Sequence, residues 1–182
     1  MTIPDTFQLS KRCPPIQELE WLESWCIKNK KPNLKVLEFG CGITSWILCE
    51  TLSPKIQVAV EQYPECIMQV KKHCPDIEIV STWDLIPKNN YDWLLIDSST
   101  GWPEGIKPMT AKRPFRDDAV KYALPLCKKN VTVILHDYDH RKAGWRVARV
   151  WLENNGFECI DKYRYRFGFG IMRRNTNAST PV

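Results

Sequence analysis

The sequence predicts an α/β fold, a three-layer sandwich whose seven-stranded, mostly parallel sheet ends in an antiparallel C-terminal hairpin. Short apolar segments alternate along the chain with segments of helical periodicity, which is typical of parallel strands covered by helices on both faces. The last two apolar segments have no helix between them, so they are expected to pair antiparallel. The length of 182 residues is close to that of one domain.

The first half of the chain supplies four expected strands and three helices. Apolar residues at positions 16, 19, 22, 25 and 26 follow a helical stripe, so a helix is expected over 16–29, after an irregular arm over 1–14. A glycine-rich turn over 40–42 separates the first strand from the second helix. The strands are expected over 34–39, 56–60, 77–80 and 91–96, and the two further helices over 44–51 and 64–73.

The second half opens with a long loop over 98–114, and loops of that length are often functional. Gly156 is expected to end the last helix, because glycine readily adopts the left-handed conformation that closes many helices. The remaining expectations are helices over 115–128 and 141–155, strands over 131–135, 157–163 and 167–172, and a polar tail over 175–182.

The composition excludes several classes of protein. With 43% hydrophobic and 26% charged residues the chain is globular rather than disordered. No apolar run approaches the roughly 20 residues that span a bilayer, and the N-terminus has no apolar core of a secretory signal. A cytoplasmic protein is therefore expected. The eight cysteines form no CxxC pair, which favours reduced thiols over a disulfide framework or a zinc cluster.

The net charge of +5 is mild, and much of the basic excess lies around 162–174. Such an excess is compatible with an anionic substrate or with nucleic acid, but a solvated basic face is the commoner explanation.

The strongest functional signal is the run Glu38-Phe39-Gly40-Cys41-Gly42-Ile43-Thr44-Ser45, which joins the first expected strand to its helix. Gly40 and Gly42 allow a tight turn and let a ligand approach the backbone, and the start of the following helix presents free N–H groups. Glu61 stands 19 residues after Gly42, at the end of the second strand. An acid at that place can accept both hydroxyl hydrogens of a ribose.

Two details distinguish between nucleotide cofactors. A dinucleotide-binding loop usually has a third glycine where this chain has Ser45. Glu38 would repel a pyrophosphate but suits a cationic ligand, such as the ammonium or sulfonium of an amino-acid-bearing nucleoside. The structural alternative is a glycine turn that only packs a helix on a strand.

This pattern resembles the class I, Rossmann-like S-adenosylmethionine-dependent methyltransferases, whose first motif is an acid-x-Gly-x-Gly turn. The resemblance covers about residues 34–172 and includes the acid after the second strand and the closing hairpin. It implies one methyltransferase domain over 1–182, with an N-terminal arm and helix over 1–33, a catalytic core over 34–174 and a tail over 175–182.

The resemblance implies a role for each residue of the expected cofactor site. Glu38 would lie near the methionine part of S-adenosylmethionine, Glu61 would bind the ribose hydroxyls, and Gln62 would lie beside the adenine. Trp83, within Thr82-Trp83-Asp84, would supply the adenine wall or, alternatively, be a core aromatic. The expected cofactor-binding residues are Glu38, Gly40, Cys41, Gly42, Thr44, Ser45, Glu61, Gln62, Trp83 and Asp97.

Asp97 ends the fourth expected strand, where this family places residues that face the methyl group. The residues after it, Ser98-Ser99-Thr100, differ from the Asn/Asp-Pro-Pro-aromatic motif of amino-group nucleic-acid methyltransferases, and no Pro-Cys nucleophile of the cytosine C5 enzymes occurs there. Both absences argue against methylation of DNA bases. A loop or helix cap is the alternative role of Asp97.

The fifth expected strand ends in His136-Asp137-Tyr138-Asp139-His140-Arg141, a high density of titratable groups. His136 can act as a base near neutral pH, and a neighbouring Asp can orient it or raise its pKa. The expected catalytic residues are Asp97, His136 and Asp137.

Two other interpretations of this run stay open. With Asp97 it could hold a divalent metal through oxygen and imidazole ligands, as in some small O-methyltransferases of this class. Their pattern of acids is not clearly matched, so no metal ligand is predicted. In the structural interpretation, Asp139 caps the next helix while His140 and Arg141 face solvent.

A second, shorter resemblance links the chain to plant polysaccharide (glucuronoxylan) O-methyltransferases. These share an Asp-x-x-x-Gly-aromatic loop, here Asp97-Ser-Ser-Thr-Gly-Trp, followed by a His-Asp pair, here His136-Asp137. The match suggests a hydroxyl or carboxyl acceptor, which Lys112, Arg113 or Arg116 could bind if it is anionic; a solvated loop is the alternative.

The sequence therefore predicts a methyltransferase that uses S-adenosylmethionine to methylate an oxygen of a small or saccharide-like acceptor. The competing hypotheses are transfer to RNA or protein, and a non-catalytic cofactor-binding module of the same fold. A nicotinamide oxidoreductase is disfavoured by Ser45 and Glu38. A membrane partner is not expected, nucleic acid is not favoured, and the oligomeric state stays open.

Overall fold

The structure, a computed structural model, describes residues 3, 4, 7, 14–97, 116–139, 146–163 and 168–175, without the side chain of Asp117. The expected loop over 98–114, most of the arm over 1–14, the tail over 176–182 and the start of the helix expected over 141–155 lie outside the described residues.

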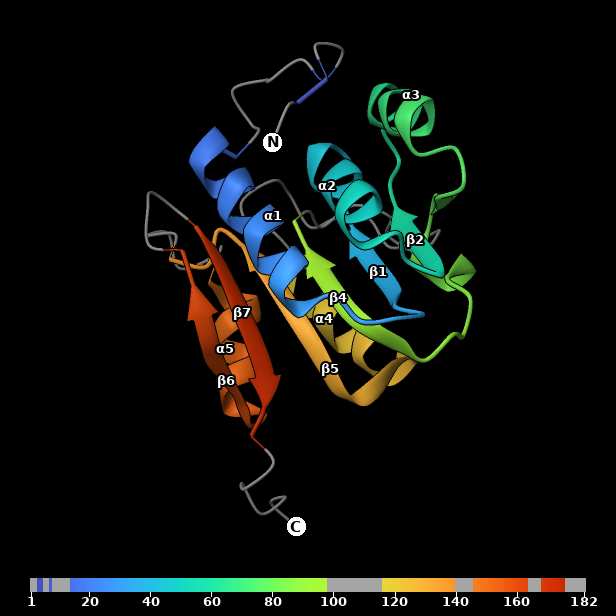
Figure 1. Ribbon diagram of the computed structural model, residues 1–182. Coiled ribbons are helices and arrows are strands. Elements are labelled where there is room, and N and C mark those ends of the chain that lie inside the picture. Colours follow the sequence, from blue (N-terminus) through green and yellow to red (C-terminus); the bar gives the residue numbers. More distant parts are fainter. Residues whose placement is uncertain are drawn as a thin grey trace.

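The described chain forms one seven-stranded sheet with the order β3-β2-β1-β4-β5-β7-β6 (Figure 1). The strands from β3 to β5 pair in parallel, while β7 is antiparallel to both β5 and β6. The predicted α/β fold with a closing antiparallel hairpin is therefore confirmed. The strands are β1 (Lys35–Phe39), β2 (Ile56–Val60), β3 (Glu78–Val80), β4 (Tyr91–Ile96), β5 (Cys127–His136), β6 (Phe157–Lys162) and β7 (Phe169–Arg174).

Helices cover both faces of the sheet, which makes three layers (Figure 1). Of the α-helices in the described ranges, three lie on one face and two on the other, and most of the crossings between parallel strands pass through one of them. The first face holds α1 (Ile16–Asn29), α2 (Ile43–Leu52) and α3 (Pro64–His73), and the second holds α4 (Arg116–Ala123) and α5 (Val147–Asn154).

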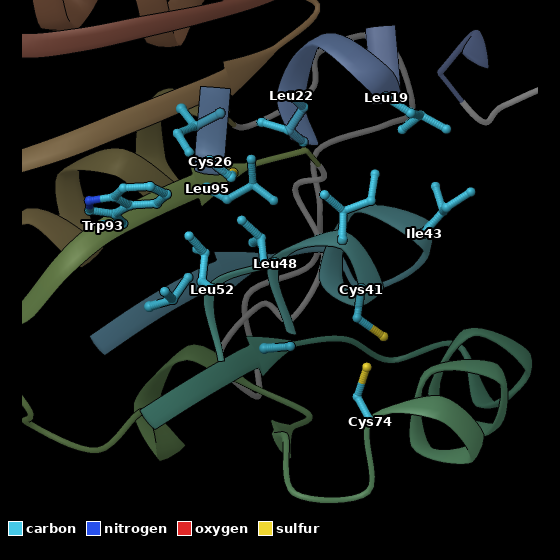
Figure 2. Packing of buried hydrophobic residues seen from close by; sticks show 14 of the residues in the cluster. Leu19, Leu22, Cys26, Cys41, Ile43, Leu48, Leu52, Cys74, Trp93 and Leu95 are labelled. Atoms are coloured by element: carbon cyan, nitrogen blue, oxygen red, sulfur yellow. The ribbon is translucent and has the colours of Figure 1, made fainter. Parts of the chain in front are cut away.

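The helix α1 packs against α2 through the apolar stripe that its sequence spacing predicts. Leu19, Leu22 and Cys26 are buried and face the apolar side chains of α2, above Trp93 and Leu95 of β4 (Figure 2). Burying one leucine side chain contributes about 1.5–3 kcal/mol, so this contact holds α1 firmly on the sheet.

One predicted boundary is wrong. The helix expected over 115–128 ends at Ala123, and a 3₁₀ turn over Leu124–Leu126 leads into β5, which begins at Cys127 instead of 131. Pro125 explains the early end, because proline cannot donate the backbone hydrogen bond that a longer helix needs. The short 3₁₀ helix over Trp83–Leu85 was not predicted from the sequence.

In the described part of the chain, no helix combines the length and apolarity that crossing a membrane requires. The seven cysteines in that part are free thiols.

Candidate functional site

The carboxyl ends of the parallel strands meet at one edge of the sheet, and the predicted site residues follow these ends (Figure 1). Backbone hydrogen bonds continue just beyond the strands: Gly40 N–H donates to Val60 at 2.9 Å, and Asp97 N–H donates to Phe39 at 3.1 Å. The strand order reverses between β1 and β4, where sheets of this kind bind their ligands. The structure therefore brings the glycine turn, the end of β2 and the end of β4 to the same edge.

The glycine turn has the geometry that its residues predict. Gly40 has a φ of 87°, a left-handed conformation that favours glycine. The backbone N–H of Gly42 donates to the hydroxyl of Ser45 at 3.0 Å, which fixes the start of α2. A Cβ atom built on Gly42 would meet no heavy atom of the described residues within 4 Å. The turn therefore leaves open space beside its backbone.

Glu38 lies beneath this turn rather than at its surface. Its side chain is 0% exposed, and its two oxygens accept hydrogen bonds from Ser45 Oγ at 2.8 Å and Gln57 Nε2 at 2.9 Å. Burial raises the pKa of Glu38 to about 8, although both hydrogen bonds lower it. In this structure Glu38 supports the turn through Ser45, and its predicted place near a methionine group stays a prediction.

Glu61 is tied to the turn by backbone hydrogen bonds. Its Oε2 accepts the N–H of Cys41 at 3.1 Å, and its Oε1 accepts those of Gln62 at 2.7 Å and Tyr63 at 3.0 Å. A carboxylate has about four acceptor positions. Three are occupied, so one remains for a ligand hydroxyl, and a second hydroxyl would have to replace one of these bonds.

The other predicted cofactor residues lie around this edge. Gln62 is exposed beyond β2, whereas Cys41 is buried in the turn. Trp83 is buried in the core, with its ring edge-on to Phe39 at 5.5 Å. Trp83 thus occupies the core position that the sequence left as an alternative, and its contact to an adenine stays a prediction.

Asp97 and His136 form the closest ionisable pair of the described site. The Nδ1 atom of His136 lies 2.6 Å from Asp97 Oδ1, and Thr44 Oγ1 donates to Asp97 Oδ2 at 3.4 Å. Burial alone would raise the pKa of Asp97, but the positive charge and hydrogen bond of His136, followed by the charge of Arg116, hold it below its ordinary value. Asp97 is therefore an anion at neutral pH, and its side chain is 24% exposed.

The pKa of His136 is raised, whereas that of Asp97 is lowered. Burial alone would lower its pKa, but the negative charge and hydrogen bond of Asp97, together with Glu18 and Asp137, raise it to about 10. The ring also packs on Phe169 of β7 at 4.8 Å between centroids. A histidine with this pKa carries its proton at neutral pH.

Arg116, at the start of α4, joins the ends of β4 and β5. Its guanidinium donates to the carbonyl oxygens of Asp97 and of His136, the latter at 2.6 Å, and pairs with Asp137 at 2.9 Å. Asp137 has a φ of 58°, which few residues other than glycine adopt. The ion pair to Arg116 thus accompanies a strained backbone at the end of β5.

Glu18 of α1 is a site residue that the sequence analysis missed. Its side chain is 1% exposed, and its Oε2 lies 3.5 Å from Nε2 of His136. A signal was present, since Glu18 precedes Leu22 by four residues and Trp25 by seven and so lies on the buried face of the helix. An acid on that face needs a partner inside the fold.

Other predicted groups stay apart or undescribed. Asp139 lies within ion-pair distance of Arg149 and Lys162, at 3.0 and 3.2 Å, while His140 and Arg141 fall outside the described residues, as do Lys112 and Arg113. In the described ranges, no three or more His, Cys, Asp and Glu side chains are arranged to hold a metal ion.

Comparison with known proteins supports this fold. No protein-family model and no curated protein sequence matches the chain. The structure resembles the O-methyltransferase TomG from Streptomyces achromogenes, solved with SAM, at a TM-score of 0.63 and 15% identity, over 91% of this chain and 83% of that one. It also resembles an O-methyltransferase from Bacillus cereus that was solved with SAH. The TM-score is 0.63 and the identity 13%, over 92% of this chain and 84% of that one.

A third similar structure is the precorrin-6y C5,15-methyltransferase of Geobacter metallireducens, at a TM-score of 0.63 and 14% identity, over 94% of this chain and 95% of that one. Together with the strand order and the glycine turn, these matches give the class: the chain has the class I, Rossmann-like fold of S-adenosylmethionine-dependent methyltransferases.

Proposed function

We propose that the protein is a methyltransferase that uses S-adenosylmethionine to methylate an oxygen of a small or saccharide-like, hydroxylated or acidic acceptor. The observation that carries the proposal is the glycine turn after β1, where a Cβ atom on Gly42 would meet no described atom within 4 Å and Glu61 accepts the N–H of Cys41, in a fold whose similar structures were solved with SAM or SAH. The acceptor class rests on the sequence resemblances and on the O-methyltransferases among these relatives.

The donors and acceptors at this edge fit the cofactor. A Cβ atom on Gly42 would meet no described atom within 4 Å, so a ligand can approach the backbone there. Glu61 has one acceptor position left beside its three described donors, which suits a ribose hydroxyl. Asp97 is a partly buried anion at the neighbouring strand end, which suits a cationic ligand.

S-adenosylmethionine supplies a methyl group that its sulfonium has already activated. The protein then has to hold the acceptor oxygen in line with that methyl group and receive the hydroxyl proton. Asp97 or His136 is the candidate for the proton, because they lie together at the ends of β4 and β5.

Calorimetric titration with S-adenosylmethionine and S-adenosylhomocysteine tests the cofactor. We expect Glu61→Ala to weaken binding at least about tenfold, because a hydrogen bond to a charged group contributes about 1.5–3 kcal/mol. Glu65→Ala, at an exposed position in the first turn of α3, is the matched control and should bind as the wild type does. Folded wild-type protein that binds neither compound would overturn the proposal.

A protein or RNA acceptor is the second candidate. One similar structure is described as a ribosomal protein L11 methylase from Lactobacillus delbrueckii, with 16% identity and a TM-score of 0.62. Methyl transfer to ribosomal material that weakens steeply with salt would favour an RNA acceptor, since phosphate contacts release counterions. Cofactor binding without turnover on any acceptor class would indicate a non-catalytic module.

A further inference from the structure

The helix α1 brings a buried carboxylate to the site. Glu18 is 1% exposed, and neither of its oxygens has a hydrogen bond of ordinary geometry among the described residues. Its Oε2 nevertheless lies 3.5 Å from Nε2 of His136, within ion-pair distance. A buried anion is stable only when a positive charge or hydrogen-bond donors face it. The imidazole of His136 is in position to provide that charge.

His136 stands between two carboxylates, one at each ring nitrogen. Nδ1 faces Asp97 Oδ1 at 2.6 Å, and Nε2 faces Glu18 Oε2 at 3.5 Å. An ionised carboxylate can only accept hydrogen bonds. The hydrogen bond to an ionised Asp97 needs hydrogen on Nδ1, and the negative charge of Glu18 favours hydrogen on Nε2, so with both carboxylates ionised we expect the ring to be an imidazolium.

The remaining charges around His136 favour the imidazolium as well. Asp137 Oδ2 lies 3.8 Å from Nδ1, and Arg116 pairs with Asp137 while donating to the His136 carbonyl. Three carboxylates lie near the ring, and one of them pairs with the guanidinium of Arg116. With all three ionised, a neutral ring would leave two negative charges in excess and a charged ring only one. The packing of Phe169 excludes water from one face of the ring and strengthens these interactions.

We propose that Glu18 is a positioning residue of the site, which from α1 fixes His136 as an imidazolium between two carboxylates and leaves Asp97 as the group that receives a proton. The pKa of His136, raised to about 10, agrees with this arrangement. His136 then acts as a fixed cation that orients Asp97, and the predicted role of His136 as a base passes to Asp97.

The consequence for the reaction rests on the proposed function. As the bond between the methyl carbon and the acceptor oxygen forms, the bond between that carbon and sulfur breaks and its electron pair stays on sulfur. The acceptor hydroxyl releases its proton to Asp97, which becomes neutral. Sulfonium, hydroxyl and carboxylate thus become thioether, methyl ether and carboxylic acid, with charge and atoms conserved.

Nitrogen NMR of the histidine rings tests the protonation state without any ligand. The chain has three histidines, and backbone assignment identifies the ring of His136. At about pH 8, well above the ordinary histidine pKa of about 6.5, we expect both nitrogens of His136 in the wild type to show the shifts of an imidazolium. A neutral His136 ring at that pH would overturn the proposal.

The variant Glu18→Gln tests the contribution of α1, because it keeps the shape of the side chain and removes its charge. We expect the titration midpoint of His136 to fall by at least about one pH unit, as an opposite charge within about 4–6 Å shifts a pKa by about 1–3. Glu20→Gln makes the same chemical change at an exposed position of the same helix and should leave the midpoint unchanged. Equal midpoints in wild type and Glu18→Gln would also overturn the proposal.

The two proposals fail separately. If the wild-type ring is an imidazolium but the protein binds no S-adenosyl compound, the positioning role holds and the methyltransferase proposal falls. If the cofactor binds and the ring is neutral at pH 8, the methyltransferase proposal holds and the positioning role of Glu18 falls. Should Glu18→Gln fail to fold, the measurement on the wild type still decides.

Discussion

The hydroxyl of Ser45 joins the glycine turn to the buried carboxylate of Glu38. It donates a hydrogen bond of 2.8 Å to Oε2 of Glu38, and its oxygen accepts the backbone N–H of Gly42 at 3.0 Å. A hydroxyl has one hydrogen, so Ser45 can donate to Glu38 only while that oxygen of Glu38 acts as an acceptor. The hydrogen bonding of the turn is therefore coupled to the protonation of a carboxyl group that solvent does not reach.

The first prediction concerns the pH dependence of stability. Burial raises the pKa of Glu38 in the folded protein to about 8, above the value of about 4.3 in an unfolded chain. The stabilisation of the folded state by the proton on Glu38 is therefore complete below the pKa of Glu38 in the unfolded chain. It is lost as the pH rises through about 8. Between about pH 5 and 8 we expect the free energy of unfolding of the wild type to fall relative to that of Glu38→Gln, measured by urea unfolding.

The exposed change Glu20→Gln serves as the control for this series, and its pH profile should follow that of the wild type. Parallel profiles for the wild type and Glu38→Gln would show that Glu38 does not titrate with a raised pKa.

The second prediction separates ligand binding from folding at the glycine turn. A methyl group added at Gly42 meets no atom within 4 Å in the part of the chain that the structure describes, and the φ of 170° is extended backbone. Gly42→Ala should therefore change the free energy of unfolding by less than about 0.5 kcal/mol. The methyl group would occupy the space assigned to the cofactor, so we expect S-adenosylhomocysteine to bind at least about tenfold more weakly, by calorimetry.

Gly156→Ala gives the opposite pattern and is the control. It also has open space around its Cβ position, but its φ of 78° strains an alanine, so it should lose about 1 kcal/mol of stability and keep its affinity. Unchanged affinity in Gly42→Ala would mean that no ligand lies beside this part of the turn.

The third prediction concerns the bridge between the ends of β4 and β5. Replacing Arg116 by methionine leaves the buried carboxylate of Asp137 without its ion pair, which should cost about 3–5 kcal/mol in urea unfolding. In the double variant with Asp137→Asn part of this loss should be recovered, because the uncompensated charge is gone. Lys121→Met, on the exposed face of α4, should change little. If the losses of unfolding free energy in the two single variants simply add up in the double variant, Arg116 and Asp137 do not interact directly.

The fourth prediction tests the packing of the closing hairpin. A Cβ atom at Gly170 would lie 2.1 Å from Cδ2 of Tyr138, so β7 approaches the ring too closely for any side chain. We expect Gly170→Ala to lose about 1–3 kcal/mol in thermal or urea unfolding. The loss should be smaller when Tyr138 is also alanine, since the clash is then absent. An equal loss in both backgrounds would place the cause elsewhere than the ring.

The sequence predicted the sheet and the common edge at which the candidate site residues lie, because both depend on local pattern. The periodicity of each segment marks a strand or a helix, and the carboxyl ends of parallel strands meet at one edge. The strand pattern therefore places Asp97 and His136 at the same edge of the sheet. In the structure, Nδ1 of His136 lies 2.6 Å from Oδ1 of Asp97.

What the sequence could not predict depends on distant contacts. The pattern of α1 shows that Glu18 faces inward, but not that His136 lies there, since that contact depends on how α1 packs on the sheet. Without Glu18 the ring of His136 has one free nitrogen and would be expected to act as a base. The hydrogen bonds of Arg116 to the ends of β4 and β5 could not be predicted from local pattern either, because they go to backbone carbonyls, which carry no sequence signal.

The contact between Glu18 and His136 also bears on how the chain folds during synthesis. The two residues are 118 positions apart (136 − 18). At about 5–20 residues per second, a ribosome needs about 6–24 seconds to make the chain between them. For all of that interval α1 exists without the complete β5, and for most of it without β4, so Glu18 has no partner and part of the apolar stripe is uncovered. We therefore expect the nascent N-terminal helix to be a binding site for chaperones until β5 has left the ribosome.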